Sequence, residues 1–271
     1  MKTSLKFFSF IVIALTVITS CNKGLNRVFI KSGDFSIKSI VAEGKTVQNF
    51  VYNSSRQIAE THSFYFFNKY SYDKNNRLVK QEIAVDPDIY SSSMHIKSEL
   101  MTSQNSTFTN YYIFEYNNAG KLVTQKNYFK KEDKFEYTSK ISLIYEGDKI
   151  AKRNIHDATN SITQFYTYEY DSNGNVINEK YYSFLFITGT EPKLIRETSF
   201  KYDDKNNPFK IFQDLGIPGF YSNTNNIIES NSVLHENVPG IDKYSTSRTT
   251  YEYNDKGFPT IVNQSEEYIY D

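Results

Sequence analysis

Residues 168–176 read Tyr-Glu-Tyr-Asp-Ser-Asn-Gly-Asn-Val, and they are the clearest copy of a unit that recurs along the chain. Asp or Asn at the first position and Gly at the fourth favour a type I turn, and Asp171 and Gly174 occupy those positions. Gly174 can adopt the left-handed conformation that completes a bulged hairpin. The stretch therefore predicts two antiparallel strands, with Tyr170 facing Val176 across them.

The unit, aromatic-x-Tyr-Asp/Asn-x-x-Gly/Asn-x-apolar, occurs seven times. Its other copies read FVYNSSRQI (50–58), YSYDKNNRL (70–78), FEYNNAGKL (114–122), FKYDDKNNP (200–208) and YEYNDKGFP (251–259), with a short form LIYEGDKI (143–150). Asn76 and Asn206 stand where other copies have glycine, and Asn tolerates a positive φ, whereas Arg56 departs from the pattern. Hairpins in series predict an all-β, antiparallel up-and-down meander of about 14 strands. A sheet of that size must curl to manage its edges, so we expect a soluble barrel or half-barrel.

The composition limits the function. The 23 Tyr and 21 Phe residues supply a large apolar area for a core. With 31 basic and 31 acidic side chains, the chain has no excess of positive charge for nucleic acid. There is one cysteine, so packing and hydrogen bonds rather than disulfides must hold the fold.

The N-terminus has the order basic, apolar, small, cysteine. Lys2 and Lys6 precede an apolar run over 7–17, and Ile18-Thr19-Ser20-Cys21 resembles the lipobox of bacterial lipoproteins. The resemblance implies that residues 1–20 are a signal peptide, that Cys21 is lipidated, and that 21–34 form a short tether before a single β-domain over 35–271. It also implies attachment to the membrane through lipid, and Asn22 after the cysteine favours the outer membrane. An ordinary secretory peptide with a chance cysteine is the alternative.

The repeats resemble the YD repeats of Rhs-type proteins. The whole chain after the tether is more similar to a lipoprotein family of unknown function with a porin-like fold, the DUF4595 family. Asn206-Asn207-Pro208-Phe209 and Asn225-Asn226-Ile227 carry this resemblance together with the repeats. The family implies a barrel-like sheet and no activity or cofactor.

A membrane-spanning barrel is not expected, because the face opposite the tyrosines is charged. It carries Glu115, Glu169, Lys201 and Glu252 near the middle of the predicted strands. Charges on a lipid-facing surface are destabilising.

The motifs of the common catalytic and metal sites are absent from the sequence. There is no G-x-S-x-G, H-E-x-x-H or P-loop, and the histidines, His62, His95, His156 and His235, lie on separate segments. Asp171, Asn173 and Asn175 begin like a calcium loop, but Val176 and Tyr182 replace its Gly and Glu. Adjacent carboxylates, as in Asp203-Asp204 and Glu266-Glu267, would point to opposite faces of a strand. We expect no enzyme, metal or cofactor.

Two long connections, about 86–106 and 213–246, leave two interpretations open. The apolar residues of the second form a lid over the barrel, or they form a ligand or partner surface. The tyrosines fill the interior, or they stack on sugar rings. The sequence predicts a non-enzymatic lipid-anchored envelope protein that binds or scaffolds an unidentified envelope protein or glycan. The alternatives are a glycan-binding or carbohydrate-active lipoprotein and a truncated relative of the Rhs shell.

Overall fold

The computed structural model describes residues 36–90, 98–184, 191–213, 218–219, 221–236 and 242–271. They form one sheet of 17 antiparallel strands and two short 3-10 helices. The elements are β1 Ile37–Ala42, β2 Lys45–Tyr52, β3 Ile58–Ser63, β4 Phe66–Tyr72, β5 Leu78–Val85, η1 Pro87–Tyr90, β6 Asn110–Tyr116, β7 Leu122–Lys131, β8 Lys134–Glu146, β9 Lys149–His156, β10 Ile162–Tyr170, β11 Val176–Ser183, β12 Lys193–Tyr202, η2 Pro208–Phe212, β13 Ile227–Leu234, β14 Tyr244–Arg248, β15 Tyr251–Tyr253, β16 Pro259–Val262 and β17 Glu266–Tyr270.

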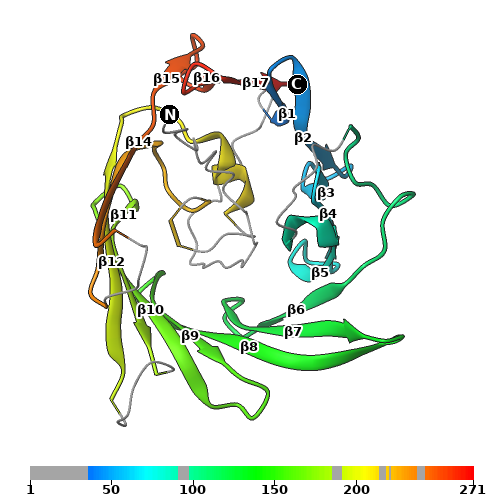
Figure 1. Cartoon of the computed structure of the whole chain (residues 1–271), viewed down its shortest axis with the longest axis vertical. Helices are drawn as coiled ribbons and strands as arrows, with labels where there is room; N and C mark the ends of the chain where they lie inside the picture. The colour runs from blue at the N-terminus through cyan, green and yellow to red at the C-terminus, as the bar shows by residue number, and fades with distance from the viewer. Residues whose placement is uncertain (1–35, 91–97, 185–190, 214–217, 220, 237–241) are drawn as a thin grey trace, which may run out of the picture.

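The sheet curls into a ring (Figure 1). Each strand from β1 to β14 pairs with the next, β15 to β17 do the same, and β17 returns to pair with β1. The described pairings do not join β14 to β15, so the ladder is interrupted there. These findings confirm the predicted all-β up-and-down meander curled into a half-barrel. The strands are more numerous than the 14 expected because the chain also turns back outside the repeated unit, as at Glu43-Gly44 and Glu132-Asp133.

The repeated unit forms the predicted bulged hairpin. In 168–176, the Asp171 carboxylate accepts hydrogen bonds from the N–H groups of Asn173 (2.9 Å) and Asn175 (2.8 Å). Tyr170 pairs with Val176 across a register shift, and Gly174 has φ 87°. The fourth turn position has a positive φ in other copies too, at Arg56, Asn76, Gly120 and Gly257. Arg56 therefore adopts the turn despite its departure from the pattern, as does Asn160 in a similar turn at 157–161 that the sequence analysis missed.

The copy at 200–208 corrects the prediction. Asn206 is not among the residues with positive φ, and no tight hairpin forms. The Asp203 N–H instead donates to the Asn226 carbonyl (3.1 Å), and the Asn226 N–H donates to the Asp203 carboxylate (3.0 Å). Tyr202 correspondingly pairs with Ile227. The hydrogen-bond pattern of the unit is thus kept, but a long excursion that begins with η2 is inserted into its turn.

The tyrosines of the unit point into the ring, and each hydroxyl is bonded. In the five copies from Tyr72 to Tyr202 the hydroxyl donates to the carbonyl of the apolar residue that ends the preceding unit, whereas Tyr253 donates to the Asp203 carboxylate. Tyr72 bonds Ile58 (2.8 Å), Tyr116 bonds Leu78 (2.9 Å), Tyr145 bonds Leu122 (2.8 Å), Tyr170 bonds Ile150 (2.9 Å), and Tyr202 bonds Val176. This confirms that these tyrosines fill the interior. These units all turn at one end of the ring, which we call the turn end.

The two ends of the described chain together complete one more unit. Tyr270 pairs with Ile37 as Tyr170 pairs with Val176, and the Asp271 N–H donates to the Ser36 carbonyl (3.1 Å). The Tyr52 hydroxyl then donates to the Ile37 carbonyl (2.8 Å), which continues the series of tyrosine bonds. A split repeat therefore joins β17 to β1.

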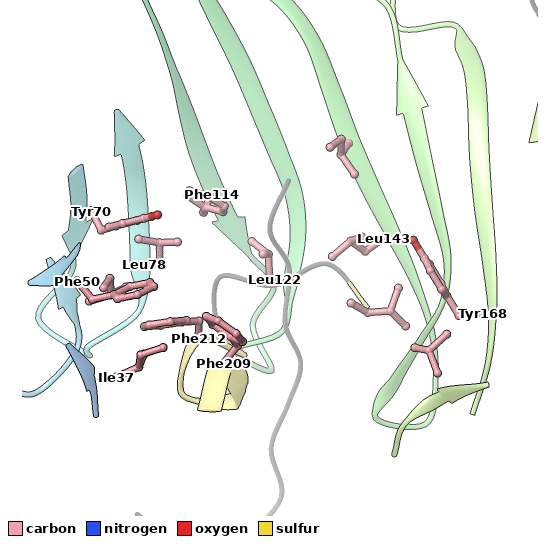
Figure 2. Packing of buried hydrophobic residues seen from close by; sticks show 14 of the residues in the cluster. Ile37, Phe50, Tyr70, Leu78, Phe114, Leu122, Leu143, Tyr168, Phe209 and Phe212 are labelled. Carbon is pink, nitrogen blue, oxygen red and sulfur yellow. The ribbon is translucent and has the colours of Figure 1, made fainter. Parts of the chain in front are cut away.

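The inserted segment supplies part of the core at the turn end. Phe209 and Phe212 of η2 are buried, and the Phe212 ring stacks on Phe50 at 5.5 Å between centroids (Figure 2). The expectation of one long connection over 213–246 was wrong, because β13 and β14 lie within it. Ile227 and Ile228 belong to β13 and not to a loop.

The first long connection is confirmed, and it packs on the outside of the ring. Phe108 stacks on Phe67 of β4 at 5.6 Å, and the Met101 N–H donates to the Ser63 carbonyl (2.9 Å). Residues 91–97 lie outside the described residues.

The positive φ of Gly174 gives a direct test of the turn. Gly174→Val should lower the free energy of unfolding by about 1–3 kcal/mol, because a β-branched side chain is strained at positive φ whatever space surrounds it. Gly174→Asn should cost less, since Asn76 adopts the same conformation. Ser172→Val is the matched control, because Ser172 is not among the residues with positive φ. Equal urea midpoints for the two valine variants would contradict the assigned turn.

The split unit predicts a circular permutant that folds. In the intact unit three residues, Ser172-Asn173-Gly174, separate the residues that correspond to Asp271 and Ser36. Joining Asp271 to Ser36 through Ser-Asn-Gly, and opening the chain between Glu132 and Asp133, should retain the β-rich circular dichroism spectrum and the urea midpoint of the parent 36–271 chain. The control is the same opening between Glu132 and Asp133 without the linker, which leaves two separate chains, 36–132 and 133–271. A permutant that aggregates while this control folds would contradict the split unit.

Candidate functional site

Beyond the apolar core of the turn end, the inner wall of the ring is polar. Gln81 and Gln125 are completely buried on β5 and β7. The Gln81 amide donates to Asn68 (3.1 Å), but its carbonyl oxygen has no hydrogen-bond partner, and neither end of the Gln125 amide has one. Such atoms are rare in buried positions, because an unmade hydrogen bond there destabilises the fold.

Four side chains form a continuous row across this wall. Arg153 of β9 pairs with Tyr166 of β10, Tyr166 pairs with Tyr181 of β11, and Tyr181 pairs with Arg196 of β12. The Arg153 guanidinium lies 5.2 Å from the centre of the Tyr166 ring, and the Tyr166 and Tyr181 rings stack at 4.9 Å. Residues directly opposite on neighbouring antiparallel strands share one face, and Tyr166 packs against the core, so the row faces inward. We call these four residues the Arg/Tyr row.

Glu179 lies one step closer to the turn end, opposite Tyr168. Its carboxylate is 3.6 Å from the Arg196 guanidinium. Burial raises the pKa of Glu179, although Arg196 and Arg153 both act to lower it. Two cations therefore share one carboxylate whose ionisation is opposed by burial.

The row runs from solvent into the interior. The Arg196 side chain is 45% exposed, whereas Arg153 is only 5% exposed. At the buried end, Arg153 interacts with the Tyr168 side chain and acts to lower the pKa that burial raises for Tyr168. The Arg153 Nε has no further hydrogen-bond partner. The arrangement can therefore offer hydrogen-bond donors to a group that approaches past Arg196.

Two small cavities lie closer to the core. One, of about 30 Å³, is lined by Asn207, Pro208, Phe209, Asn225, Asn226, Ile227, Tyr251 and Tyr268. The other, of about 20 Å³, is lined by Gln48, Phe50, Ile58, Thr61, Tyr70, Phe212 and Tyr221. Each has room for a water molecule and not for an organic ligand.

The outer wall is charged, as the sequence predicted, and several of its charges are paired. Lys126 bonds Glu115 (2.6 Å), and Lys201 bonds Glu229 (2.8 Å). The hydrogen bond from Lys201, with those from Asn231 and Arg248, lowers the pKa of Glu229 to about 2. In the part of the chain that the structure describes, no helix is long and apolar enough to cross a membrane.

The residues considered from the sequence do not gather into a site. Cys21 and His95 lie outside the described residues. His62 contacts Glu60, His156 contacts Ser142, and His235 lies near Glu197, each on its own part of the sheet. Among the described residues, no group of three or more His, Cys, Asp or Glu side chains could hold a metal ion.

The acidic candidates are structural. Asp171 holds its own turn, which supports the Asx-turn over the calcium loop. Asp203 bonds Asn226, while its neighbour Asp204 is exposed and contacts Lys205. These two carboxylates do not face each other. The Arg/Tyr row escaped the sequence analysis because its arginines lie outside the repeated units and meet only through strand register.

Comparisons with known proteins give the fold. No family model and no curated protein matches the chain. A porin-like protein from Bacteroides vulgatus superposes with a TM-score of 0.52 at 10% identity, over 88% of this chain and 99% of that one. A porin-like protein from Bacteroides uniformis gives 0.38 at 12% identity over 88% and 98%, and a protein of unknown function from Bacteroides fragilis gives 0.35 at 13% over 49% and 89%. The chain thus shares the fold of the Bacteroides vulgatus protein.

The raised pKa of Glu179 predicts a pH dependence. The folded state holds this proton more tightly than the unfolded state, so the contribution of Glu179 to stability is full below its ordinary pKa of 4.5 and is lost as pH rises through the raised value. The stability of Glu179→Gln relative to the parent should therefore increase as pH rises through that range. Glu252→Gln, at an exposed position, is the control. Urea unfolding between pH 4 and 8 measures both; parallel curves for all three proteins would contradict the buried carboxylate.

Proposed function

We propose that this protein is a non-enzymatic, lipid-anchored protein of the bacterial cell envelope, whose ring is a binding domain with its binding surface on the inner wall. The observation that carries the proposal is the set of buried polar atoms without partners on the inner wall, on Gln81, Gln125 and the Nε of Arg153. A fold selected for stability alone would fill these positions with apolar side chains, because an unsatisfied buried amide destabilises it. A bound molecule would supply the missing hydrogen bonds.

The lipid anchor rests on the sequence. Residues 18–21 resemble the lipobox, with Cys21 as the acylated residue, and Asn22 favours sorting to the outer membrane. The porin-like fold of the Bacteroides vulgatus protein is compatible with an envelope protein. The ion pairs of the outer wall support a ring that stands in water beside the membrane, since paired charges would have to be desolvated in lipid.

The repeats support the proposed kinship with YD-repeat proteins and with the DUF4595 family. The glycan-binding or carbohydrate-active alternative is less well supported. The tyrosines of the repeats use their hydroxyls within the fold, and the adjacent carboxylates Asp203 and Asp204 diverge.

Gln125→Leu tests whether a polar side chain of the inner wall lowers the stability of the fold and contributes to binding. Removing an amide with no partner should raise the free energy of unfolding by about 1–3 kcal/mol. The same change should reduce the material that the immobilised protein retains from solubilised envelopes of its own bacterium. Gln104→Leu, at an exposed position, should alter neither quantity. A Gln125→Leu protein that is destabilised and retains the same material would contradict the proposal.

The anchor is tested separately. Cys21→Ser should abolish incorporation of radiolabelled palmitate and release the protein from the membrane fraction, because the thiol is the acceptor of the lipid. A Ser20→Ala variant, which keeps the small residue of the lipobox, should label normally. If Cys21→Ser incorporates as much palmitate as the parent, Cys21 is not the lipidated residue.

A further inference from the structure

We propose that the Arg/Tyr row binds the oxyanion of a small organic ligand, a carboxylate, phosphate or sulfate group, inside the ring. The inference rests on the proposed function and names the chemical class that the inner wall recognises.

Charge is the first argument. Arg153 and Arg196 both act on Glu179, and it is 3.6 Å from Arg196. One carboxylate cannot neutralise two guanidinium groups, so this part of the wall keeps a positive charge. A guanidinium that is 5% exposed is stabilised by a hydrogen-bonded anion, and guanidinium groups bind the planar or tetrahedral oxygens of such anions in pairs.

Hydrogen-bond type is the second argument. The Arg153 Nε, which has no hydrogen-bond partner, can only donate. The two tyrosine rings of the row stack on each other, and the Arg153 guanidinium lies over the Tyr166 ring. The Tyr166 ring is therefore already in contact with two neighbours of the row, while the two guanidinium groups supply N–H donors. An anion satisfies such a set of donors better than a neutral sugar does.

Access is the third argument. Arg196 is the exposed end of the row, with its side chain 45% exposed, and Arg153 is the buried end. The oxyanion would be engaged first by Arg196, in competition with Glu179. Removing the arginine and removing the glutamate should therefore have opposite effects on the affinity for the anion.

The test is calorimetric titration of the purified protein with sulfate, phosphate and glucuronate at constant ionic strength, with glucose as the neutral probe. At least one of the three anions should bind, glucose should not, and the preferred anion identifies the group. Arg196→Gln should weaken binding by about tenfold, since one charge-assisted hydrogen bond is lost. Glu179→Gln should strengthen it several-fold, because the competing carboxylate is removed. Arg248→Gln, on the exposed strand β14, should bind as the parent does.

The inference would be overturned by no binding of any anion at millimolar concentration, by anion binding that Arg196→Gln leaves unchanged, or by glucose binding as tightly as glucuronate. Circular dichroism of each variant identifies loss of folding, and a weaker affinity in a folded Glu179→Gln protein would also overturn the inference. If no anion binds but Gln125→Leu still retains less envelope material than the parent, the ligand class is wrong and the proposed binding function stands. If no anion binds and Gln125→Leu retains as much material as the parent, the inner wall is not a binding surface.

Discussion

The hydrogen bond from a repeat tyrosine to the carbonyl that ends the preceding unit, which every copy but the one at 251–259 makes, is the constraint on which the ring depends. It joins residues that are 14 positions apart in Tyr72 and Ile58 and 38 apart in Tyr116 and Leu78. The contact is the same although the connections differ, because it is made at the turn end, where the tyrosine and the last apolar residue of each unit pair in the same way, even in the copy at 200–208 whose turn carries the insertion. Strands can therefore vary in length at the other end without disturbing the core. A buried hydroxyl also needs a partner, so each bond removes a penalty as well as joining neighbouring units.

The same geometry explains how the sheet manages its edges. A meander of this length would leave the hydrogen-bonding groups of β1 and β17 exposed to association with other chains. Tyr270-Asp271 and Ser36-Ile37 instead build a unit from the two ends of the described chain. The remaining interruption, between β14 and β15, falls within one continuous segment, where Arg248 still pairs with β13 and Tyr251 already pairs with β16. Between β14 and β15 the sheet is therefore held together by the covalent chain and not by hydrogen bonds of the ladder.

The parts of the fold that depend on local chemistry could be predicted from the sequence, and the parts that depend on distant residues could not. Asp171 and Gly174 define their turn within four residues, so the sequence was sufficient. The copy at 200–208 has the same local signals, and Pro259 shows that proline at its last position does not prevent a hairpin. The hairpin is lost because the inserted segment buries Phe209 and Phe212 in the ring, and no residue near Asp203 signals that burial. The turn at 157–161 was missed for the opposite reason, since its chemistry is right but His156 stands where the unit has tyrosine.

The candidate site follows from the position of each tyrosine relative to the turn. Tyr166, Tyr168 and Tyr170 lie on one face of β10, but only the last is close enough to the turn end to reach the preceding unit, where its hydroxyl bonds Ile150. Tyr168 instead interacts with Arg153, and the Tyr166 ring contacts both Arg153 and Tyr181. The apolar core and the tyrosine bonds hold the ring at one end, and this leaves the wall beyond them able to carry groups that contribute little to stability. The same residue type thus joins neighbouring units at Tyr170, fills the core at Tyr168, and at Tyr166 contacts the arginine of the surface that we propose for binding.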